Sequence, residues 1–160
     1  MLGEILTILS GYGQSTVDKI RQNMSTTGTD ASGESSRSLT FEVTESGSKA
    51  TLKVKAKPYF MVVETGRKPT PEFTKPSESF VDRIKSWLTA RGKDQGAAYA
   101  IAKNIHKEGT KLWQTGGRTD IVSNVVNPSL VEEISRSLLK DFAKTYLVSV
   151  ANTFRDGNRN

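Results

Sequence analysis

Residues 39–57 read LTFEVTESGSKATLKVKAK, and this stretch decides the fold class. Apolar and polar residues alternate in each half of it, and the sequence ESGS at residues 45–48 separates the halves. The apolar set consists of Leu39, Phe41, Val43, Ala50, Leu52, Val54 and Ala56. Alternation with a period of two on both sides of a glycine-containing turn predicts an antiparallel β-hairpin with one buried and one solvated face.

The solvated face of the second predicted strand carries a row of lysines, Lys53, Lys55 and Lys57. Two interpretations are open. The lysines form an ordinary solvated face that protects an open sheet edge, or they form a strip that faces an anion or a protein partner. We therefore count these three residues among the candidate interface residues.

Upstream of the hairpin, apolar residues recur at helical spacing on both sides of Gly11 and Gly13. They are Leu2, Ile5, Leu6, Leu9, Val17, Ile20 and Met24. We expect a core-facing helix that the two glycines weaken or bend. Residues 25–37 are rich in Ser, Thr and Gly, and they predict a flexible loop.

Downstream of the hairpin, residues 59–64 read YFMVVE, which is too short for periodicity to separate strand from helix. We favour a helical turn that ends at Gly66. Three prolines make residues 67–76 an extended loop. Its first residues, Arg67, Lys68 and Pro69, form an exposed arm that is a second candidate interface.

Two helices are predicted next, at residues 77–91 and 94–109. Ser77 can cap the first helix, and Asp94 can cap the second. Their apolar stripes are Phe80, Ile84, Trp87 and Leu88, then Ala98, Ile101, Ala102 and Ile105. We interpret these stripes, together with Tyr59 and Phe60, as core.

Residues 110–118 predict a loop in which Trp113 lies near Lys111 and Arg118. Trp113 is either an anchor tucked into the domain's own core or an intermolecular contact, and both interpretations are open. Trp113 and Arg118 are therefore candidate interface residues as well.

The last predicted helix opens at residues 127–129, with a capping box formed by Ser129 and Glu132. Its predicted core stripe is Ile134, Leu138 and Phe142, with Tyr146 and Val150 beyond. Residues 155–160 are polar and predict a frayed tail. Together these elements predict a single α+β domain over residues 1–160, with a small antiparallel sheet built on a hairpin and packed against several helices.

The composition restricts the function classes. Only 35% of the 160 residues are hydrophobic, so either some segments are solvated or a partner completes part of the apolar surface. The absence of cysteine excludes disulfides and thiolate metal sites and fits a reducing compartment. No run reaches the roughly 20 apolar residues that a membrane span needs, and residues 1–9 lack the basic leader of a secretory signal.

The positive charge is concentrated in the middle of the chain. Residues 46–118 hold 15 basic and 6 acidic side chains, a net charge of +9. Residues 1–45 hold 3 basic and 6 acidic side chains, a net of −3, and residues 119–160 hold 5 of each. This distribution, with aromatic residues interleaved in the basic segment, leaves a basic nucleic-acid-binding module as an alternative function, although no recognised nucleic-acid motif is present.

No arrangement typical of an active site is apparent. The single histidine, His106, lies in the alanine-rich helix without a nucleophile motif nearby, and we expect it to be an exposed or partly buried helical residue. Glu64, Glu72, Glu78 and Asp82 lack the spacing of a metal site or a glycosidase pair. We therefore expect no enzyme, no metal and no cofactor.

The order of the elements resembles the small neck proteins of tailed bacteriophages, the head–tail connector or tail-completion family. The resemblance covers residues 38–109 and extends to the ends only by type of element. Family members often have a proline-rich loop after the alanine-rich helix, whereas residues 110–118 contain no proline. The elements that carry the resemblance are the hairpin, Tyr59-Phe60, Val63-Glu64-Thr65-Gly66, Ile84-x-x-Trp87-Leu88, Ala100-Ile101-Ala102-x-x-Ile105 and Gly109.

The resemblance implies a structural protein that forms a homo-oligomeric ring at the head–tail junction of a virion assembled in the host cytoplasm. Such a ring binds other neck, portal-associated and tail proteins, involves no membrane, and lets DNA pass without sequence-specific binding. The residues that the resemblance marks as scaffold are Tyr59, Glu64, Gly66, Trp87 and Gly109.

Overall fold

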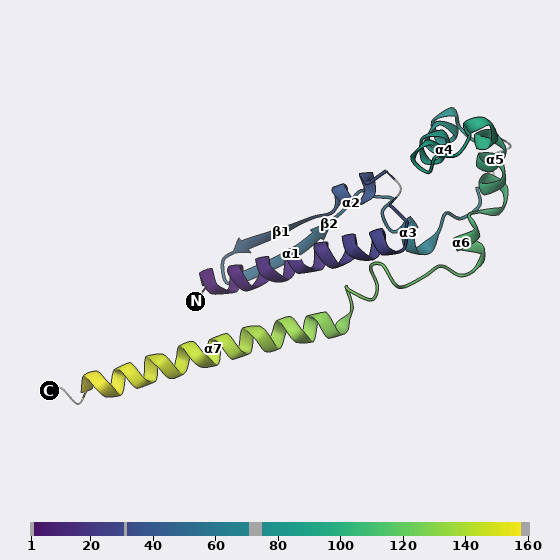
Figure 1. Ribbon diagram of the computed structural model, residues 1–160. Helices are drawn as coiled ribbons and strands as arrows, with labels where there is room; N and C mark the ends of the chain where they lie inside the picture. Colours follow the sequence, from purple (N-terminus) through teal and green to yellow (C-terminus); the bar gives the residue numbers. More distant parts are fainter. Residues whose placement is uncertain (1, 31, 71–74, 158–160) are drawn as a thin grey trace.

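Figure 1 shows an elongated molecule in which one helix lies along a small sheet and other helices extend away from it. The computed structural model describes residues 2–30, 32–70 and 75–157. The strands are β1 (Thr40–Ser46) and β2 (Lys49–Lys55). The helices are α1 (Leu2–Thr26), α2 (Glu34–Ser38), α3 (Val62–Thr65), α4 (Glu78–Ala90), the 3-10 helix η1 (Gln95–Ala97), α5 (Ala98–Glu108), α6 (Lys111–Gln114) and α7 (Pro128–Gly157). The predicted α+β class, with a small antiparallel sheet and several helices, is confirmed.

β1 and β2 pair in the register that the alternating sequence predicts. Phe41 lies opposite Val54, and Val43 lies opposite Leu52, so the apolar side chains share one face. The ladder continues to the ends of both strands, which narrows the turn to residues 47–48. The predicted hairpin is therefore confirmed, with a tighter turn than expected.

α1 covers the apolar face of the hairpin at close range, and Gly13 permits this approach. A Cβ atom at Gly13 would lie 2.8 Å from Leu52 Cδ1 and closer still to the Phe41 ring. A Cβ atom at Gly11 would meet nothing within 4 Å. Since α1 continues through both glycines, Gly13 brings the helix and the sheet together and does not bend the chain.

The core lies where the end of α1 meets the start of the hairpin and the segment before α7. Its largest fully buried side chains are Ile20, Met24, Leu39, Ile121 and Val17. Burying an aliphatic side chain of this size contributes about 1.5–3 kcal/mol. Because these residues come from distant parts of the chain, the core joins α1 and the hairpin to the segment before α7.

The segment predicted as a flexible loop at residues 25–37 is partly helical, which corrects its boundaries. α1 extends into its first residues, and α2 occupies its last ones. Arg21 donates hydrogen bonds to the carbonyl groups of Ser36 at 3.2 Å and Leu39 at 2.9 Å, which tie α2 to α1. Residue 31 lies outside the described residues.

The helices predicted downstream of the hairpin are present. α3 ends at Gly66, and the Oγ of Ser77 accepts the Phe80 N–H at 3.3 Å to cap α4. Asp94 caps η1, and α5 ends at Gly109. Within the extended loop predicted at 67–76, residues 71–74 lie outside the described residues.

Two aromatic residues interpreted as core are on the surface instead. Tyr59 is 49% exposed and Trp87 is 40% exposed. The Arg91 guanidinium lies 4.9 Å from the centre of the Trp87 ring. The helical stripe was identified correctly, but α4 packs mainly on α5 and covers Leu88 rather than Trp87.

α7 begins at Pro128, because Asn127 is its cap. The Oδ1 of Asn127 accepts the Leu130 N–H at 3.1 Å, and proline suits the first helical position. The predicted capping box at Ser129 is therefore wrong. The helix runs through residues 155–157 of the tail predicted to fray, and residues 158–160 lie outside the described residues.

The accessible surface is large for a chain of this mass. The chain has a mass of 17.5 kDa and an accessible surface of 11082 Å². A compact monomer of this mass exposes about 7,900 Å² by the scaling of surface with mass. The excess accompanies the extended placement of α4, α5 and α7 in Figure 1, so the single chain buries less of itself than a compact domain does.

Candidate functional site

Glu64 in α3 is a buried carboxylate that holds the segment before α7 in place. Its Oε1 accepts the N–H groups of Ile121 at 2.9 Å, Val122 at 2.5 Å and Ser123 at 3.0 Å. Its Oε2 accepts the Ser123 hydroxyl at 2.6 Å. Successive N–H groups that converge on one point form an anion-binding turn, and here the chain supplies the anion itself.

These hydrogen bonds determine the charge state of Glu64. Burial of the carboxyl, which is 2% exposed, acts to raise its pKa. The hydrogen bonds from the Ser123 hydroxyl and from the three backbone N–H groups outweigh burial, so the pKa lies below its ordinary value. Glu64 is therefore a charged structural anchor at neutral pH.

Around Glu64, residues 64–70 and 106–118 are joined by hydrogen bonds into what we call the α3–α6 junction. This junction connects α4 and α5 to the hairpin body, a name we use for α1, α2, β1 and β2. Its backbone hydrogen bonds join Arg118 N–H to the Glu64 carbonyl at 2.8 Å, Thr110 N–H to the Arg67 carbonyl at 2.9 Å, and Thr70 N–H to the His106 carbonyl at 2.8 Å.

Gly66 and Gly109 allow the two segments of the junction to approach. Gly66 has a φ of 70°, and a Cβ there would lie 2.6 Å from the Thr110 Oγ1. Gly109 has a φ of 78°, and a Cβ there would lie 2.9 Å from the Arg67 carbonyl oxygen. The structure therefore brings together three of the predicted scaffold residues, Glu64, Gly66 and Gly109, whereas Tyr59 and Trp87 are exposed elsewhere.

His106 is more buried than the sequence suggested. Its side chain is 7% exposed, so it is a buried residue of α5 and not an exposed or partly buried one.

The lysine row is less available than its sequence pattern indicates. Lys55 forms an ion pair with Glu42 of the neighbouring strand, and Lys57 forms one with Glu34 of α2. Lys53, opposite Glu42 in the ladder, is exposed. Two of the three lysines thus engage carboxylates of their own chain, which favours the interpretation as a solvated, self-paired face.

The predicted arm at Arg67, Lys68 and Pro69 is part of the α3–α6 junction. The Arg67 guanidinium lies 3.6 Å from the centre of the Phe80 ring, and its burial and the nearby Arg83 lower its pKa. Pro69 is half-buried beside Gly109, and Lys68 is exposed. Of the three residues, Lys68 therefore presents the accessible charge.

Trp113 and Arg118 lie together at a pocket between α3 and α6. This α3–α6 pocket has a volume of about 550 Å³ and is lined by Met61, Glu64, Thr65, Trp113, Gly116, Gly117, Arg118, Thr119 and Ser123. Met61 is 47% exposed and Trp113 is 43% exposed. Arg118 donates two hydrogen bonds to Asp120, at 2.6 and 2.7 Å. Trp113 is thus a half-exposed wall of an open, partly apolar pocket, not an anchor in the core.

A further apolar surface, on α7, was missed by sequence reasoning. Its residues, which we call the α7 apolar face, are Val131, Leu139, Phe142 and Tyr146, with exposed fractions of 64%, 67%, 37% and 71%. Ile134 and Leu138 are only half-buried. The predicted core stripe of this helix is therefore only partly covered within the chain. The low hydrophobic content was the available signal, because it left this helix too few apolar partners.

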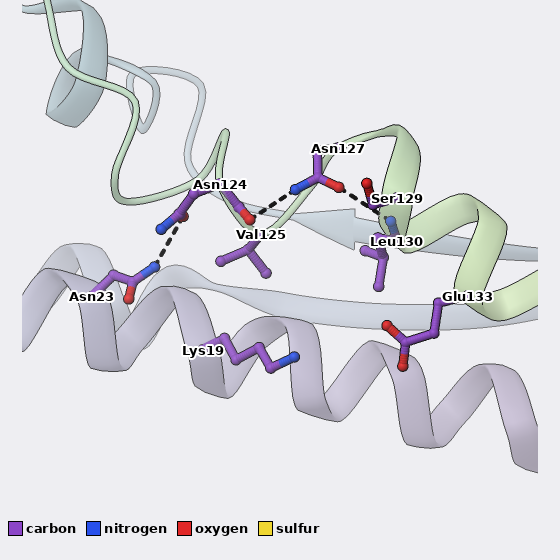
Figure 2. Close-up of a pocket in the computed structure, with 8 residues that line it drawn as sticks. All are labelled: Lys19, Asn23, Asn124, Val125, Asn127, Ser129, Leu130 and Glu133. Atoms are coloured by element: carbon purple, nitrogen blue, oxygen red, sulfur yellow. Dashed lines mark hydrogen bonds between the residues drawn. The ribbon is translucent and has the colours of Figure 1, made fainter.

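Figure 2 shows the cleft at which α7 leaves the body. This cleft has a volume of about 310 Å³ and lies between Lys19 and Asn23 of α1 and the first residues of α7. The Asn23 amide donates to Asn124 at 3.1 Å, and Tyr12 donates to Glu133 at 3.3 Å. These polar groups bond to one another and fix the base of α7.

Searches of protein-family models, of curated proteins and of solved structures found no match for this chain. Among the described residues, no group of three or more His, Cys, Asp and Glu side chains is placed to hold a metal ion. No helix in that part of the chain has the length and hydropathy of a membrane span. The candidate functional features of the described residues are therefore two surfaces, the α3–α6 pocket and the α7 apolar face.

Proposed function

We propose that this chain is a structural virion protein of the head–tail junction of a tailed bacteriophage, without catalytic activity. It forms a neck connector or tail-completion ring that joins portal-proximal proteins to the tail and lets DNA pass. The observation that carries the proposal is the uncovered α7 apolar face, on a chain that exposes far more surface than a compact monomer of its mass. In a ring, neighbouring subunits cover this apolar face.

The order of elements supports the same proposal. The hairpin, the α3 turn ending at Gly66, α4, and α5 ending at Gly109 follow one another as in the family that residues 38–109 resemble. The hairpin is also a two-stranded sheet with open edges in the described part of the chain, and open edges can pair with a neighbouring subunit.

The alternative of a basic nucleic-acid-binding module receives no specific support from the geometry. Lys55 and Lys57 engage carboxylates within the chain, and Arg118 engages Asp120. The net positive charge of residues 46–118 instead suits a ring through which DNA passes without sequence-specific contacts.

Loss of the protein in its phage tests this proposal. A phage that cannot produce the protein is expected to accumulate DNA-filled heads and separate tails, and purified wild-type particles should carry the protein at the neck by immunogold labelling. Complete particles without the protein would overturn the proposal. A DNA affinity of the isolated chain that falls steeply with salt, without any virion association, would favour the nucleic-acid-binding alternative.

A further inference from the structure

The described chain carries two uncovered apolar surfaces of opposite shape. The α3–α6 pocket is concave, with Met61 and Trp113 as its apolar walls. The α7 apolar face is convex, because it is a row of exposed side chains on one side of a helix. A helix side that fits into an apolar recess is a common mode of protein recognition.

One chain cannot bring these two surfaces together. In Figure 1, α3 and α6 lie at one end of the hairpin body, and α7 runs from that region toward the opposite end. The first turns of α7 are fixed to α1, with Tyr12 bonded to Glu133. The middle of α7, with Leu139, Phe142 and Tyr146, therefore points away from its own pocket.

The charged side chains at the pocket are already paired within the chain. The pocket lining holds one acidic and one basic residue, Glu64 and Arg118. Glu64 accepts hydrogen bonds from residues 121–123, and Arg118 donates to Asp120. An apolar helix face can therefore cover the pocket without burying an unpaired charge.

The chain exposes enough surface for two contacts with neighbouring copies. The chain exposes about 3,200 Å² more than a compact monomer of its mass, and a standard interface buries about 800 Å² on each partner. A subunit that uses its pocket on one side and its α7 on the other needs two such contacts, which together remain within the excess.

We propose that the middle of α7 of one copy, residues 139–146, seats its apolar face in the α3–α6 pocket of the next copy. The contact is heterologous, since each copy gives a helix and receives another, and such contacts close into a ring when their rotation allows it. The inference rests on the proposed function for its ring, and it names the surfaces that join the subunits.

Engineered cysteines test this contact in the full chain, which has no cysteine of its own. One variant carries Tyr146→Cys on the α7 apolar face, and a second carries Thr119→Cys at the pocket. The matched control is Lys144→Cys, because residues two apart lie on nearly opposite sides of a helix. Each chain is oxidised alone and in mixtures, and disulfide-linked dimers are measured by non-reducing electrophoresis and mass spectrometry.

The contact predicts disulfide dimers in the mixture of Tyr146→Cys with Thr119→Cys, at several times the yield of the mixture with Lys144→Cys. Rings without this mixed disulfide would overturn the contact and leave the neck proposal standing. Dimers from Tyr146→Cys alone at equal yield would indicate pairing of two α7 helices and would also overturn it. A mixed disulfide in open filaments would support the contact and contradict the ring, and a strictly monomeric chain would contradict both.

Discussion

At the scale of single residues, Glu64 carries the clearest structural role in the described chain. It is a buried, charged carboxylate, and it accepts hydrogen bonds from three successive N–H groups and a hydroxyl of a segment 57 to 59 positions away. A buried charge is tolerated only when its hydrogen bonds are satisfied. Glu64 meets this condition, so α3 and the segment before α7 are held as one unit.

We predict that Glu64→Gln destabilises the fold by about 1.5–3 kcal/mol at pH 7, because hydrogen bonds to a charged acceptor are lost and an amide N–H faces backbone donors. Urea denaturation of the full chain measures the free energy of unfolding. A change below 0.5 kcal/mol on this scale, typical of a surface substitution, would show that Glu64 is not an anchor.

The pH dependence follows from the direction of the pKa shift. Because the folded-state pKa of Glu64 is lowered, its contribution is complete above the pKa of an unfolded glutamate, about 4.3, and is lost as the pH falls through the lower folded value. The stability difference between wild type and Glu64→Gln should therefore shrink between pH 5 and pH 3. Measuring the difference removes the effects of other carboxylates, and a difference that stays constant with pH would contradict the assignment.

Gly66 gives a second prediction at this scale, with Gly92 as its control. Both have positive φ angles, 70° and 64°, but a Cβ at Gly66 would meet the α3–α6 junction, whereas one at Gly92 would meet nothing within 4 Å. Gly92→Ala should cost about 1–2 kcal/mol for the left-handed backbone alone. Gly66→Ala should cost about 1–3 kcal/mol more, because its Cβ would overpack the junction and because its backbone, at φ 70° and ψ 172°, lies in a region essentially confined to glycine. Thermal melting compares the two, and equal losses would mean that the close approach is not important.

At the scale of elements, the sequence predicted what local patterns determine. The alternation at residues 39–57 predicted the hairpin and its buried face, and helical spacing with glycine stops predicted α4 and α5. The helical turn of α3 was favoured because of Gly66, without support from periodicity. These features depend on residues that are close together in the chain, so a single sequence is enough to predict them. The Ser77 and Asp94 caps were predicted for the same reason.

Two of the features that the sequence did not predict depend on partners distant in the chain, and a third, the cap of α7, is local. The spacing of Trp87 is that of a core residue, and only the packing of α4 on α5 leaves it exposed. The contact of Glu64 with residues 121–123 has no local signal. At α7, Asn127 and Ser129 both suit a helix cap, and the side-chain hydrogen bond to Leu130 decides for Asn127.

The packing of α1 on the hairpin gives a matched pair of substitutions. Gly11→Ala should stabilise the protein by about 0.5–1 kcal/mol, because alanine favours the helix and the site is open. Gly13→Ala should destabilise it by about 1–3 kcal/mol, because the methyl group would overlap Phe41 and Leu52. Chemical denaturation of both variants provides the test, and changes of the same sign would contradict the close packing.

At the scale of the whole molecule, the described chain leaves apolar surface exposed that a compact monomeric domain would bury. α7 is attached to α1 near its start and exposes apolar residues between Val131 and Tyr146, and the α3–α6 pocket is open. Monomeric proteins rarely expose large apolar patches, and such patches mark interaction sites. The sequence indicated this only through low hydrophobic content, because a local stripe cannot reveal whether the chain itself covers it.

Charge on the α7 apolar face should break the assembly and leave the fold intact. We predict that Leu139→Lys lowers the oligomer fraction at least tenfold at a fixed concentration, because burial of a charge at the contact is unfavourable. Circular dichroism should remain unchanged, since Leu139 is 67% exposed. Lys144→Glu, on the opposite side of the helix, is the control, and equal loss of oligomers in both variants would contradict the role of this face.

The most direct measurement is the oligomeric state of the purified full-length chain, by native mass spectrometry combined with electron microscopy. We predict a single closed ring of defined copy number that persists on dilution into the low micromolar range. A chain that remains monomeric at every concentration, with no ring in the micrographs, would contradict assembly through its uncovered surfaces.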